Sequence, residues 1–343
     1  MNQKQLDYLF NPRSVAVVGA SNIFGKWGFN ILGRVLSSQG DRQIYAVNNK
    51  EPEALGLKTY KSLVEIPGSV DLVVITVPYQ ALSQVMQDCV NKKVKVVIVI
   101  TGGLAEVGAE GAKIEHEMVE IARRGGVRIV GPNCLGNFDT YSNFYSVPFL
   151  PKVKKGNLAL ISQSGNSSQS IFNHGLELGL GFSKFVSSGN EADLRFEDYL
   201  EYLAQDTDTK LVGLYLEGPR DTRRLLEAIR ATAEIKPVVV WKGGSSPAGA
   251  RAAASHTGAL AGSNAAWDAL LRQSGVIPVH SMEELVDVAV LCKLMAPPTG
   301  TNLALMGIGG GHIVQSADEC VLAGLKLPLL SDATREQLAR IYG

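Results

Sequence analysis

The chain alternates short, almost continuously apolar runs with longer amphipathic stretches, and no other feature limits its possible folds as much. The apolar runs are rich in β-branched residues and end in turn residues, which is typical of strands buried on both faces. Strands and helices that alternate in this way form parallel sheets covered by helices. We therefore predict an α/β fold with one doubly wound domain over residues 1–140. Its predicted strands are Ser14–Gly19, Gln43–Val47, Leu72–Val77, Val94–Ile100 and Arg128–Val130.

A second series of apolar runs and helical stretches follows and predicts a second α/β domain over residues 141–296. Its predicted strands are Leu158–Ile161, Phe182–Val186, Leu211–Leu216, Pro237–Trp241 and Val276–Val279. Ala296–Gly300 is then typical of a linker, because it combines proline, threonine and glycine.

A third unit begins after this linker, over residues 301–343. Leu303–Met306 is predicted to be a strand, and a helix is predicted from Ile313. About one strand–helix pair is present, and a unit of this size cannot bury a core alone. We expect the start of a third, incomplete domain.

Composition excludes several classes of protein. The chain has 33 basic and 33 acidic residues, so no excess of positive charge indicates nucleic acid as a partner. The polar start lacks the apolar core of a signal peptide, and no run of about 18 apolar residues could span a membrane. The four cysteines are scattered without a C-x-x-C pair, which predicts reduced thiols, no metal site and a cytoplasmic location.

A glycine-rich turn follows the first predicted strand. Gly19, Gly25 and Gly28 have the spacing G-x5-G-x2-G, which differs from the G-x-G-x-x-G of dinucleotide-binding domains. Backbone N–H groups of such a turn and of the following helix start can bind a phosphate. The second strand ends in Asn48–Lys50, where an NAD domain usually has an acidic residue. The pattern favours a phosphorylated nucleotide over NAD, and tight packing of a helix on a strand is the alternative role of the glycines.

Further polar loops follow predicted strands, and ligands bind at the sheet edge where the carboxyl ends of parallel strands meet. Thr76–Pro78, Thr101–Gly103 and Gly131–Gly136 are such loops in the first domain. In the second domain, Ser162–Ser167 combines a small polar loop with a helix start, whose free N–H groups can bind an anion. Glu217 also ends a strand, and it is either a solvated loop charge or a carboxylate that orients a histidine.

His256 lies among small residues and glycines in the run AAASHTGALAGS. Small neighbours allow a charged ligand to approach the imidazole, and a neutral imidazole is a competent nucleophile. A histidine held in an ordinary loop is the alternative. His312 follows three glycines and is the other candidate, whereas His116, His174 and His280 are expected to be solvated or structural.

Ten short motifs occur in order along essentially the whole chain. They are GAS with a downstream GKWG, AVNNK, DLVVITVP, ITGG, VGPNCLG, ISQSGN, SSGNEAD, YLEG, WKGG and SHTGALAGS. In this order they resemble the NDP-forming acyl-CoA synthetases, which are related to succinyl-CoA synthetase. The resemblance implies a Rossmann-like CoA-binding domain followed by flavodoxin-like domains with parallel sheets. It also implies an acid–thiol ligase that converts acyl-CoA, ADP and phosphate reversibly into a carboxylic acid, CoA and ATP through an acyl phosphate.

The resemblance assigns roles to individual residues. His256 matches the family's phosphohistidine, and Glu217 matches the carboxylate that orients it. Ser164, Gly165 and Asn166 match the helix start that holds the phosphoryl group. The residues that fall on the CoA-facing loops are Gly19, Ser21, Lys26, Val47, Asn49, Lys50, Pro78, Thr101 and Gly102.

The family binds ADP or ATP with Mg²⁺ on an ATP-grasp module, which is a partner subunit or a fused segment, and this chain shows no ATP-grasp pattern. The resemblance thus implies a catalytically incomplete chain that acts in an oligomer with that partner on a small carboxylic acid. Two alternatives stay open: a non-catalytic CoA- or acyl-CoA-binding regulatory module and an NAD(P)-dependent oxidoreductase. The presence of His256 and Glu217 disfavours the first, and Asn48–Lys50 disfavours the second.

Overall fold

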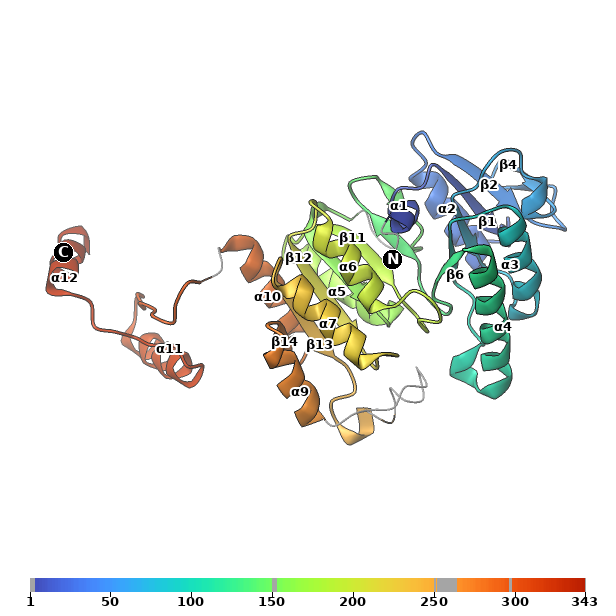
Figure 1. The fold of residues 1–343 in the computed structure, drawn as a ribbon. Helices are drawn as coiled ribbons and strands as arrows, with labels where there is room; N and C mark the ends of the chain where they lie inside the picture. Colours follow the sequence, from blue (N-terminus) through green and yellow to red (C-terminus); the bar gives the residue numbers. More distant parts are fainter. Residues whose placement is uncertain (1–3, 150–152, 250, 252–263, 296–297, 343) are drawn as a thin grey trace. The chain divides into compact units, whose positions relative to one another are not determined.

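A computed structural model gives the fold of the chain (Figure 1). It describes residues 4–149, 153–249, 251, 264–295 and 298–342. Contacts within the chain divide it into two compact units, Met1–Leu291 and Cys292–Gly343. The first unit contains both predicted sheets and the candidate site.

The first sheet has the strand order of a doubly wound fold. Its strands are β1 (Ser14–Val18), β2 (Gln43–Val47), β3 (Glu53–Ala54), β4 (Leu57–Tyr60), β5 (Leu72–Ile75), β6 (Val96–Val99) and β7 (Arg128–Val130). They lie in the order β3-β4-β2-β1-β5-β6-β7, and only the hairpin of β3 and β4 is antiparallel. The direction of chain progression reverses between β1 and β5, which is the point where ligands bind in such sheets.

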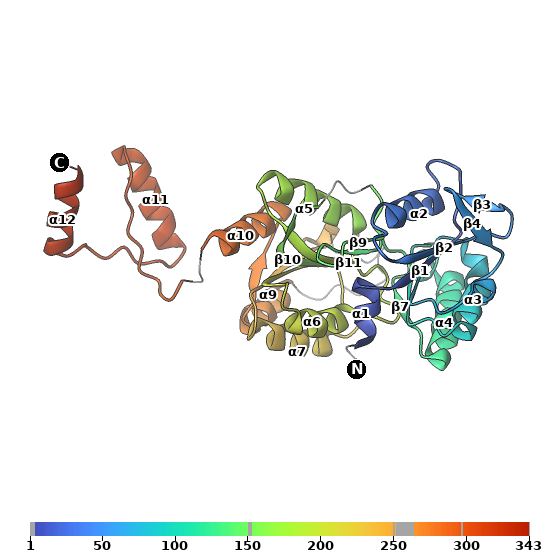
Figure 2. The same ribbon diagram turned by 90° about the horizontal axis from the view of Figure 1, so that it is seen from above.

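Helices cover both faces of this sheet (Figure 2). One face carries α2 (Trp27–Ser37), and the other carries α3 (Leu82–Asn91) and α4 (Ala109–Gly125). Short 3-10 helices complete the connections: η1 (Leu63–Glu65), η2 (Tyr79–Ala81) and η3 (Ala105–Val107). Val15 and Val17 of β1 pack in the cluster that includes α2, whereas Ala16 and Val18 pack with α3 and α4. Burial on both faces accounts for the continuous apolar runs in the sequence.

The second sheet has a flavodoxin-like order. Its strands are β8 (Asn137–Asp139), β9 (Phe144–Tyr145), β10 (Lys155–Ser162), β11 (Phe182–Ser187), β12 (Leu211–Leu216), β13 (Val238–Lys242) and β14 (Ile277–Val279). They lie in the order β14-β13-β12-β10-β11-β8-β9, with the switch point between β10 and β12. The predicted α/β fold with mainly parallel sheets is confirmed. The antiparallel edge strands β8 and β9 were not predicted, because they are short and β8 contains Asn137 and Asp139.

Helices also cover both faces of the second sheet, with α5 (Gly165–Glu177) on one face and α6 (Phe196–Gln205) and α7 (Thr222–Ala233) on the other (Figure 2). The remaining helices of this region are α9 (Asn264–Gln273) and α10 (Met282–Leu294).

The first helix, α1 (Lys4–Phe10), ties the two sheets together. Its Leu9 carbonyl accepts a hydrogen bond from Asn137 Nδ2 on β8 (2.7 Å). The ring of Phe10 stacks on Tyr202 of α6, with 5.1 Å between ring centroids. A single cluster of buried apolar residues extends from β1 to β13. The two sheets therefore share one core.

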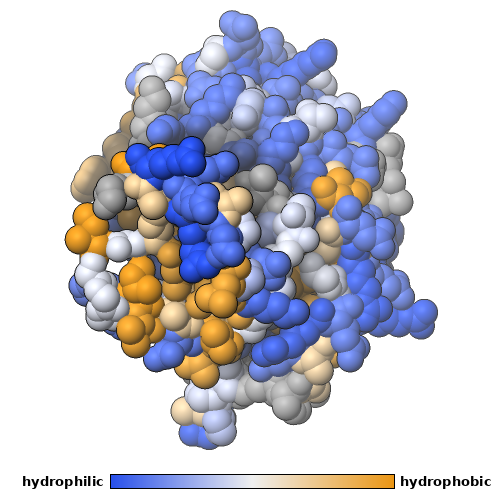
Figure 3. All heavy atoms as spheres, turned by 90° about the vertical axis from the view of Figure 1, so that its left-hand side faces the viewer, coloured by the Kyte–Doolittle hydropathy of each residue, from blue (hydrophilic) through white to orange (hydrophobic). Residues whose placement is uncertain are grey.

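The C-terminal unit contains α11 (Gly310–Leu322) and α12 (Asp332–Tyr342). Over residues 298–342 no strand forms, and Asn302 and Lys326 make an isolated bridge. The predicted strand at Leu303–Met306 is therefore wrong, because no neighbouring strand shares a ladder with it. Ile308 and Leu329 are almost fully exposed. Figure 3, a view from the left-hand side of Figure 1, shows hydrophobic side chains exposed among hydrophilic ones.

Candidate functional site

The turn after β1 packs against the ends of β5 and α2. Gly19 has a φ of +92°, and a Cβ atom there would lie 2.6 Å from Thr76 Oγ1. A Cβ atom on Gly28 would lie 1.8 Å from the Gly19 carbonyl oxygen. Gly28 is therefore required for the close approach of α2 to this turn, and Gly19 for the close approach of the loop after β5. Gly25 differs, because a Cβ atom there would meet open space, although its φ is +85°.

Asn48, directly after β2, holds the loops of the first sheet together. Its Nδ2 donates to the Ala20 carbonyl (2.7 Å), and its Oδ1 accepts from the Lys50 N–H (2.7 Å). The carboxylate of Glu51 accepts from Ser21 Oγ at 3.4 Å, and Ser21 is buried. From the sequence, Asn48 was only a departure from the NAD pattern, and no role was predicted for Glu51. An asparagine directly after a strand is the signal that could have predicted the loop-holding role of Asn48, because asparagine side chains often hydrogen-bond the backbone of a turn.

The predicted phosphate-binding side chains lie on the outside of this loop cluster. Lys26 is the N-cap residue of α2 and is exposed, as are Asn49 and Lys50. Free N–H groups at a helix start beside a lysine suit a phosphate group. Thr101 Oγ1 donates to the Val77 carbonyl (2.6 Å), which ties the loop after β6 to the loop after β5.

The remaining residues that are predicted to face CoA differ in exposure. Val47 is buried, Gly102 is half-buried and Pro78 is exposed. A Cβ atom on Gly102 would lie 2.9 Å from Asn133 Oδ1, so this loop also packs closely. The structure thus gathers the predicted loops at one sheet edge, and CoA binding by these residues stays a prediction.

The second candidate site lies at the switch point between β10 and β12. Ser164 is the N-cap residue of α5, and its Oγ accepts from the Ser167 N–H (3.2 Å). Gly165 begins the helix, and Asn166 in its first turn is exposed. Glu217 directly follows β12 and is half-buried. The predicted helix start and the predicted carboxylate therefore project from neighbouring strands.

A tyrosine hydroxyl contacts the Glu217 carboxylate. Tyr215 Oη donates to Glu217 Oε1 at 3.1 Å. Burial, together with the charge of Glu217, raises the pKa of Tyr215 to about 12. The hydroxyl consequently keeps its proton near neutral pH and remains a donor to Glu217.

His256, the predicted nucleophile, lies outside the described residues, and its role stays a prediction. His116, His280 and His312 are exposed. His174 is half-buried, and its Nδ1 lies 4.0 Å from a carboxylate oxygen of Glu177. The expectation of solvated or structural roles for His116, His174 and His280 agrees with these surroundings.

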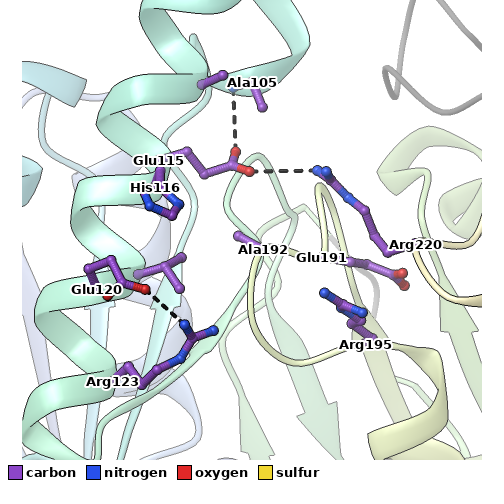
Figure 4. A pocket seen from close by; sticks show the side chains of 11 residues that line it. Ala105, Glu115, His116, Glu120, Arg123, Glu191, Ala192, Arg195 and Arg220 are labelled. Carbon is purple, nitrogen blue, oxygen red and sulfur yellow. Dashed lines mark hydrogen bonds and ion pairs between the residues drawn. The ribbon is translucent and has the colours of Figure 1, made fainter.

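A hydrogen-bond network joins helices of the first sheet to loops of the second. Asn190, in the loop after β11, donates through Nδ2 to Glu106 (2.6 Å) and Glu115 (2.9 Å). Arg220 donates to the Asn190 carbonyl (2.9 Å) and lies 3.6 Å from Glu115 (Figure 4). The roles of Glu106 and Glu115 were not predicted from the sequence, because nothing in a helical pattern marks a glutamate that faces another domain.

The two glutamates of this network titrate differently. Burial disfavours ionisation of Glu106, but hydrogen bonds from Asn190 and from the Gly103 N–H outweigh it, and the pKa of Glu106 is lowered. Burial dominates at Glu115 and raises its pKa, although Asn190 and Arg220 act in the opposite direction.

A cavity of about 320 Å³ lies beside the network, between α4 and the loop that contains Glu191 and Arg195 (Figure 4). None of the described residues predicted to bind CoA or the phosphoryl group lines it. Glu191 is 1% exposed, and neither carboxylate oxygen has a hydrogen-bond partner in the part of the chain that the structure describes. Burial raises the pKa of Glu191 to about 8.

The described ranges contain neither a cluster of metal ligands nor a membrane-spanning helix. There, no three His, Cys, Asp or Glu side chains are grouped so that they could hold a metal ion. All four cysteines are free thiols, and burial raises the pKa of Cys134 to about 12. Within the same ranges, every helix is too short or too polar to cross a membrane.

Two protein families match consecutive parts of the chain. Residues 13–138 match the family described as a CoA binding domain, and residues 155–292 match the succinyl-CoA ligase like flavodoxin domain. These ranges contain the first and the second sheet, apart from β9 and the last residue of β8.

Curated proteins and solved structures of the same kind are similar over nearly the whole chain. The alpha subunit of ADP-forming acetate–CoA ligase II from Pyrococcus furiosus is 44% identical, over 97% of this chain and 72% of that subunit. ADP-forming acetate–CoA ligase I from Archaeoglobus fulgidus is 43% identical, over 94% of this chain and 46% of that protein. A dinucleotide forming acetyl-coenzyme A synthetase from Ca. Korarchaeum cryptofilum, solved with phosphate and ADP, has a TM-score of 0.91 and 35% identity, over 98% of this chain and 72% of that chain.

Proposed function

This chain belongs to the family of ADP-forming acetate–CoA ligases, and from this premise we propose that it binds CoA and accepts the phosphoryl group in an acid–thiol ligase. The supporting observation is that Glu217 and the first turn of α5 lie at neighbouring strand ends of the second sheet. The chain spans about half the length of several of these relatives, so the activity of the whole enzyme is part of the proposal.

The first step joins phosphate to the acyl group. A phosphate oxygen attacks the thioester carbon of acyl-CoA, the carbon–sulfur bond breaks, and CoA leaves as a thiolate. Lys26, Lys50 and the N–H groups at the start of α2 hold the CoA phosphates, because cations and free N–H groups converge there. The loops after β1, β2, β5 and β6 position the rest of CoA.

The second step moves the phosphoryl group to His256. A ring nitrogen attacks phosphorus, the bond between phosphorus and the acyl oxygen breaks, and the carboxylate leaves. Glu217 accepts a hydrogen bond from the other ring nitrogen, which fixes the tautomer and stabilises the developing positive charge. The free N–H groups of α5 at Ser164, Gly165 and Asn166 stabilise the phosphoryl oxygens.

The phosphoryl group then passes to ADP on a partner with an ATP-grasp module, as a separate subunit or a fused segment. We assign Mg²⁺ to that partner together with the nucleotide, where it would neutralise phosphate charge. We expect the carboxylic acid that the enzyme releases from acyl-CoA to be small.

Phosphorylation of His256 tests the proposal. The chain with its partner, labelled ATP and magnesium should gain an acid-labile, base-stable phosphate. His256→Ala should abolish the label and the turnover, whereas the control His312→Ala should keep both. Label that persists in His256→Ala would contradict the assignment.

Calorimetric titration separates this function from an oxidoreductase. CoA should bind to the chain with a measurable heat, and NADH should not. Binding of CoA without any phosphorylation in the presence of the partner would instead favour a regulatory CoA-binding module.

A further inference from the structure

Gln163 connects the end of β10 with the N-cap residue of α5, and its side chain is buried. Its backbone N–H donates to the Tyr215 carbonyl (3.1 Å), which continues the ladder between β10 and β12. The last paired residues of that ladder are Ser162 and Tyr215. The ladder therefore provides no acceptor on β10 for the N–H groups of Glu217 and Gly218, which lie in the turn after β12.

The side chain of Gln163 supplies these missing partners. Its Oε1 accepts from the N–H groups of Glu217 (2.5 Å) and Gly218 (3.1 Å). Its Nε2 donates to the Gly218 carbonyl (3.1 Å). One neutral amide thus binds both donors and one acceptor of the turn, which an ionised carboxylate of similar size cannot do because it has no donor.

These contacts act on the carboxylate of Glu217 through its backbone. Tyr215 contacts the carboxylate itself, whereas Gln163 holds the backbone from which the carboxylate projects. Because Gln163 is bonded to Ser164, the same residue also connects to the first turn of α5. The distance between the carboxylate and the helix start therefore depends on the Gln163 side chain.

We infer that Gln163 is a positioning residue, which holds Glu217 against the start of α5 for phosphoryl transfer to and from His256. This inference rests on the proposed function, since it deepens the role of the same site. A misplacement of about 1 Å at such a site costs on the order of a hundredfold in rate. Loss of the amide should therefore slow phosphoryl transfer without weakening CoA binding at the other sheet.

A double-mutant cycle tests the inference on the complete enzyme with its partner. Gln163→Leu, Glu217→Gln and the double variant are compared by rapid-quench measurement of phosphohistidine formation. We expect each single variant to slow this step by about 10- to 100-fold. If Gln163 acts through Glu217, the double variant should be no slower than Glu217→Gln alone. The dissociation constant of CoA should stay within about twofold of wild type.

The matched control is Gln169→Leu on α5, because Gln169 is partly exposed and its amide donates to the Phe149 carbonyl. This variant should react at the wild-type rate. Gln163→Glu keeps the size and the acceptor oxygens, so it replaces Gln163→Leu in the cycle if that variant does not fold. It should be slowed less than a folded Gln163→Leu variant.

The outcomes separate this inference from the proposed function. Absence of phosphohistidine in the wild-type enzyme would refute the proposed function. A labelled wild type with an unaffected Gln163→Leu variant would overturn only the role of Gln163. If the double variant is slowed by the product of the two single fold-decreases in rate, or if CoA binding is weakened, Gln163 has a general structural role. Either result would also overturn the positioning role of Gln163.

Discussion

Among the described residues, side-chain amides that follow strands hold loops at the strand ends where the candidate sites lie. Asn48 follows β2, Gln163 follows β10, and Asn190 lies in the loop after β11. Each amide both donates and accepts hydrogen bonds: Asn190 Oδ1, for example, accepts from Asn133 Nδ2 (3.3 Å). A neutral amide can satisfy backbone donors and acceptors without adding a charge to a half-buried site.

Lys26→Ala should weaken CoA binding by about tenfold, because hydrogen bonds to charged groups contribute about 1.5–3 kcal/mol. Isothermal titration of CoA into wild type and variant measures the change. Lys210→Ala is the matched control, since Lys210 is exposed and precedes β12 at the opposite sheet edge. Equal dissociation constants for wild type and Lys26→Ala would remove Lys26 from the site.

Glu191→Gln should change how stability depends on pH. In the folded chain the pKa of Glu191 is raised to about 8, whereas its ordinary value is 4.5. Between these values the folded chain retains a proton that the unfolded chain has lost, so this group makes the wild type less stable as pH rises. The variant lacks this effect, so its free energy of unfolding relative to wild type should grow from pH 5 to pH 8.5, by more than about 1 kcal/mol, and its Tm relative to wild type should grow in parallel.

Thermal unfolding across that pH range checks the prediction. Glu117→Gln is the control, because Glu117 is exposed on α4. A difference in Tm between Glu191→Gln and wild type that stays constant with pH would mean that Glu191 is ionised in the folded chain.

Among the elements, α4 and the loop after β11 are connected by polar contacts around Asn190, which we call the joint at Asn190. Asn190 bonds to Glu106 of η3 and to Glu115 of α4, and Arg220 reinforces the joint from the loop after β12. The loop after β6 contains the predicted CoA-facing residues Thr101 and Gly102 and leads directly into η3. The joint therefore connects the two candidate regions.

Asn190→Ala should destabilise the chain by about 2 kcal/mol, because it leaves the half-buried Glu106 and the buried Glu115 with fewer donors. Urea unfolding measures this loss. Asn91→Ala, at the exposed end of α3, is the control and should change stability by less than about 0.5 kcal/mol. An equally small effect of Asn190→Ala would mean that the joint contributes nothing to the folded state.

At the scale of the whole molecule, the shared core predicts that the two sheets unfold together. The cluster of buried residues includes residues from both sheets and from α1. Trp27 on α2 and Trp241 on β13 can report on the two sheets separately. Variants that retain only one of these two tryptophans, with Trp267 of α9 also replaced, should show the same urea midpoint. Separate midpoints would indicate two independently folding domains.

The C-terminal unit should contribute little to that transition. Many of its large apolar side chains are exposed, including Ile308, Leu322 and Leu329. A chain that ends after Met295 should therefore unfold at the urea midpoint of the full chain. A lower midpoint would show that this unit stabilises the first.

The sequence by itself determined the α/β class, the positions of the longer strands and the edge at which ligands bind. These follow from local patterns, since a strand buried on both faces must be apolar along its length and parallel strands share one carboxyl edge. Motif resemblance also predicted Glu217 and the start of α5, which the fold brings to neighbouring strands.

Only the tertiary structure decided the antiparallel strands β8 and β9, the hydrogen bonds from the Gln163 side chain to the turn at Glu217, and the hydrogen-bond network at Asn190. Each depends on contacts between residues far apart in the chain: Gln163 meets Glu217 54 residues later, and Asn190 meets Glu106 84 residues earlier. Periodicity cannot report such contacts, because a side-chain amide is equally compatible with solvent and with a distant backbone. The missing strand at Leu303–Met306 has the same cause, since an apolar run becomes a strand only where a neighbouring strand completes its hydrogen bonds.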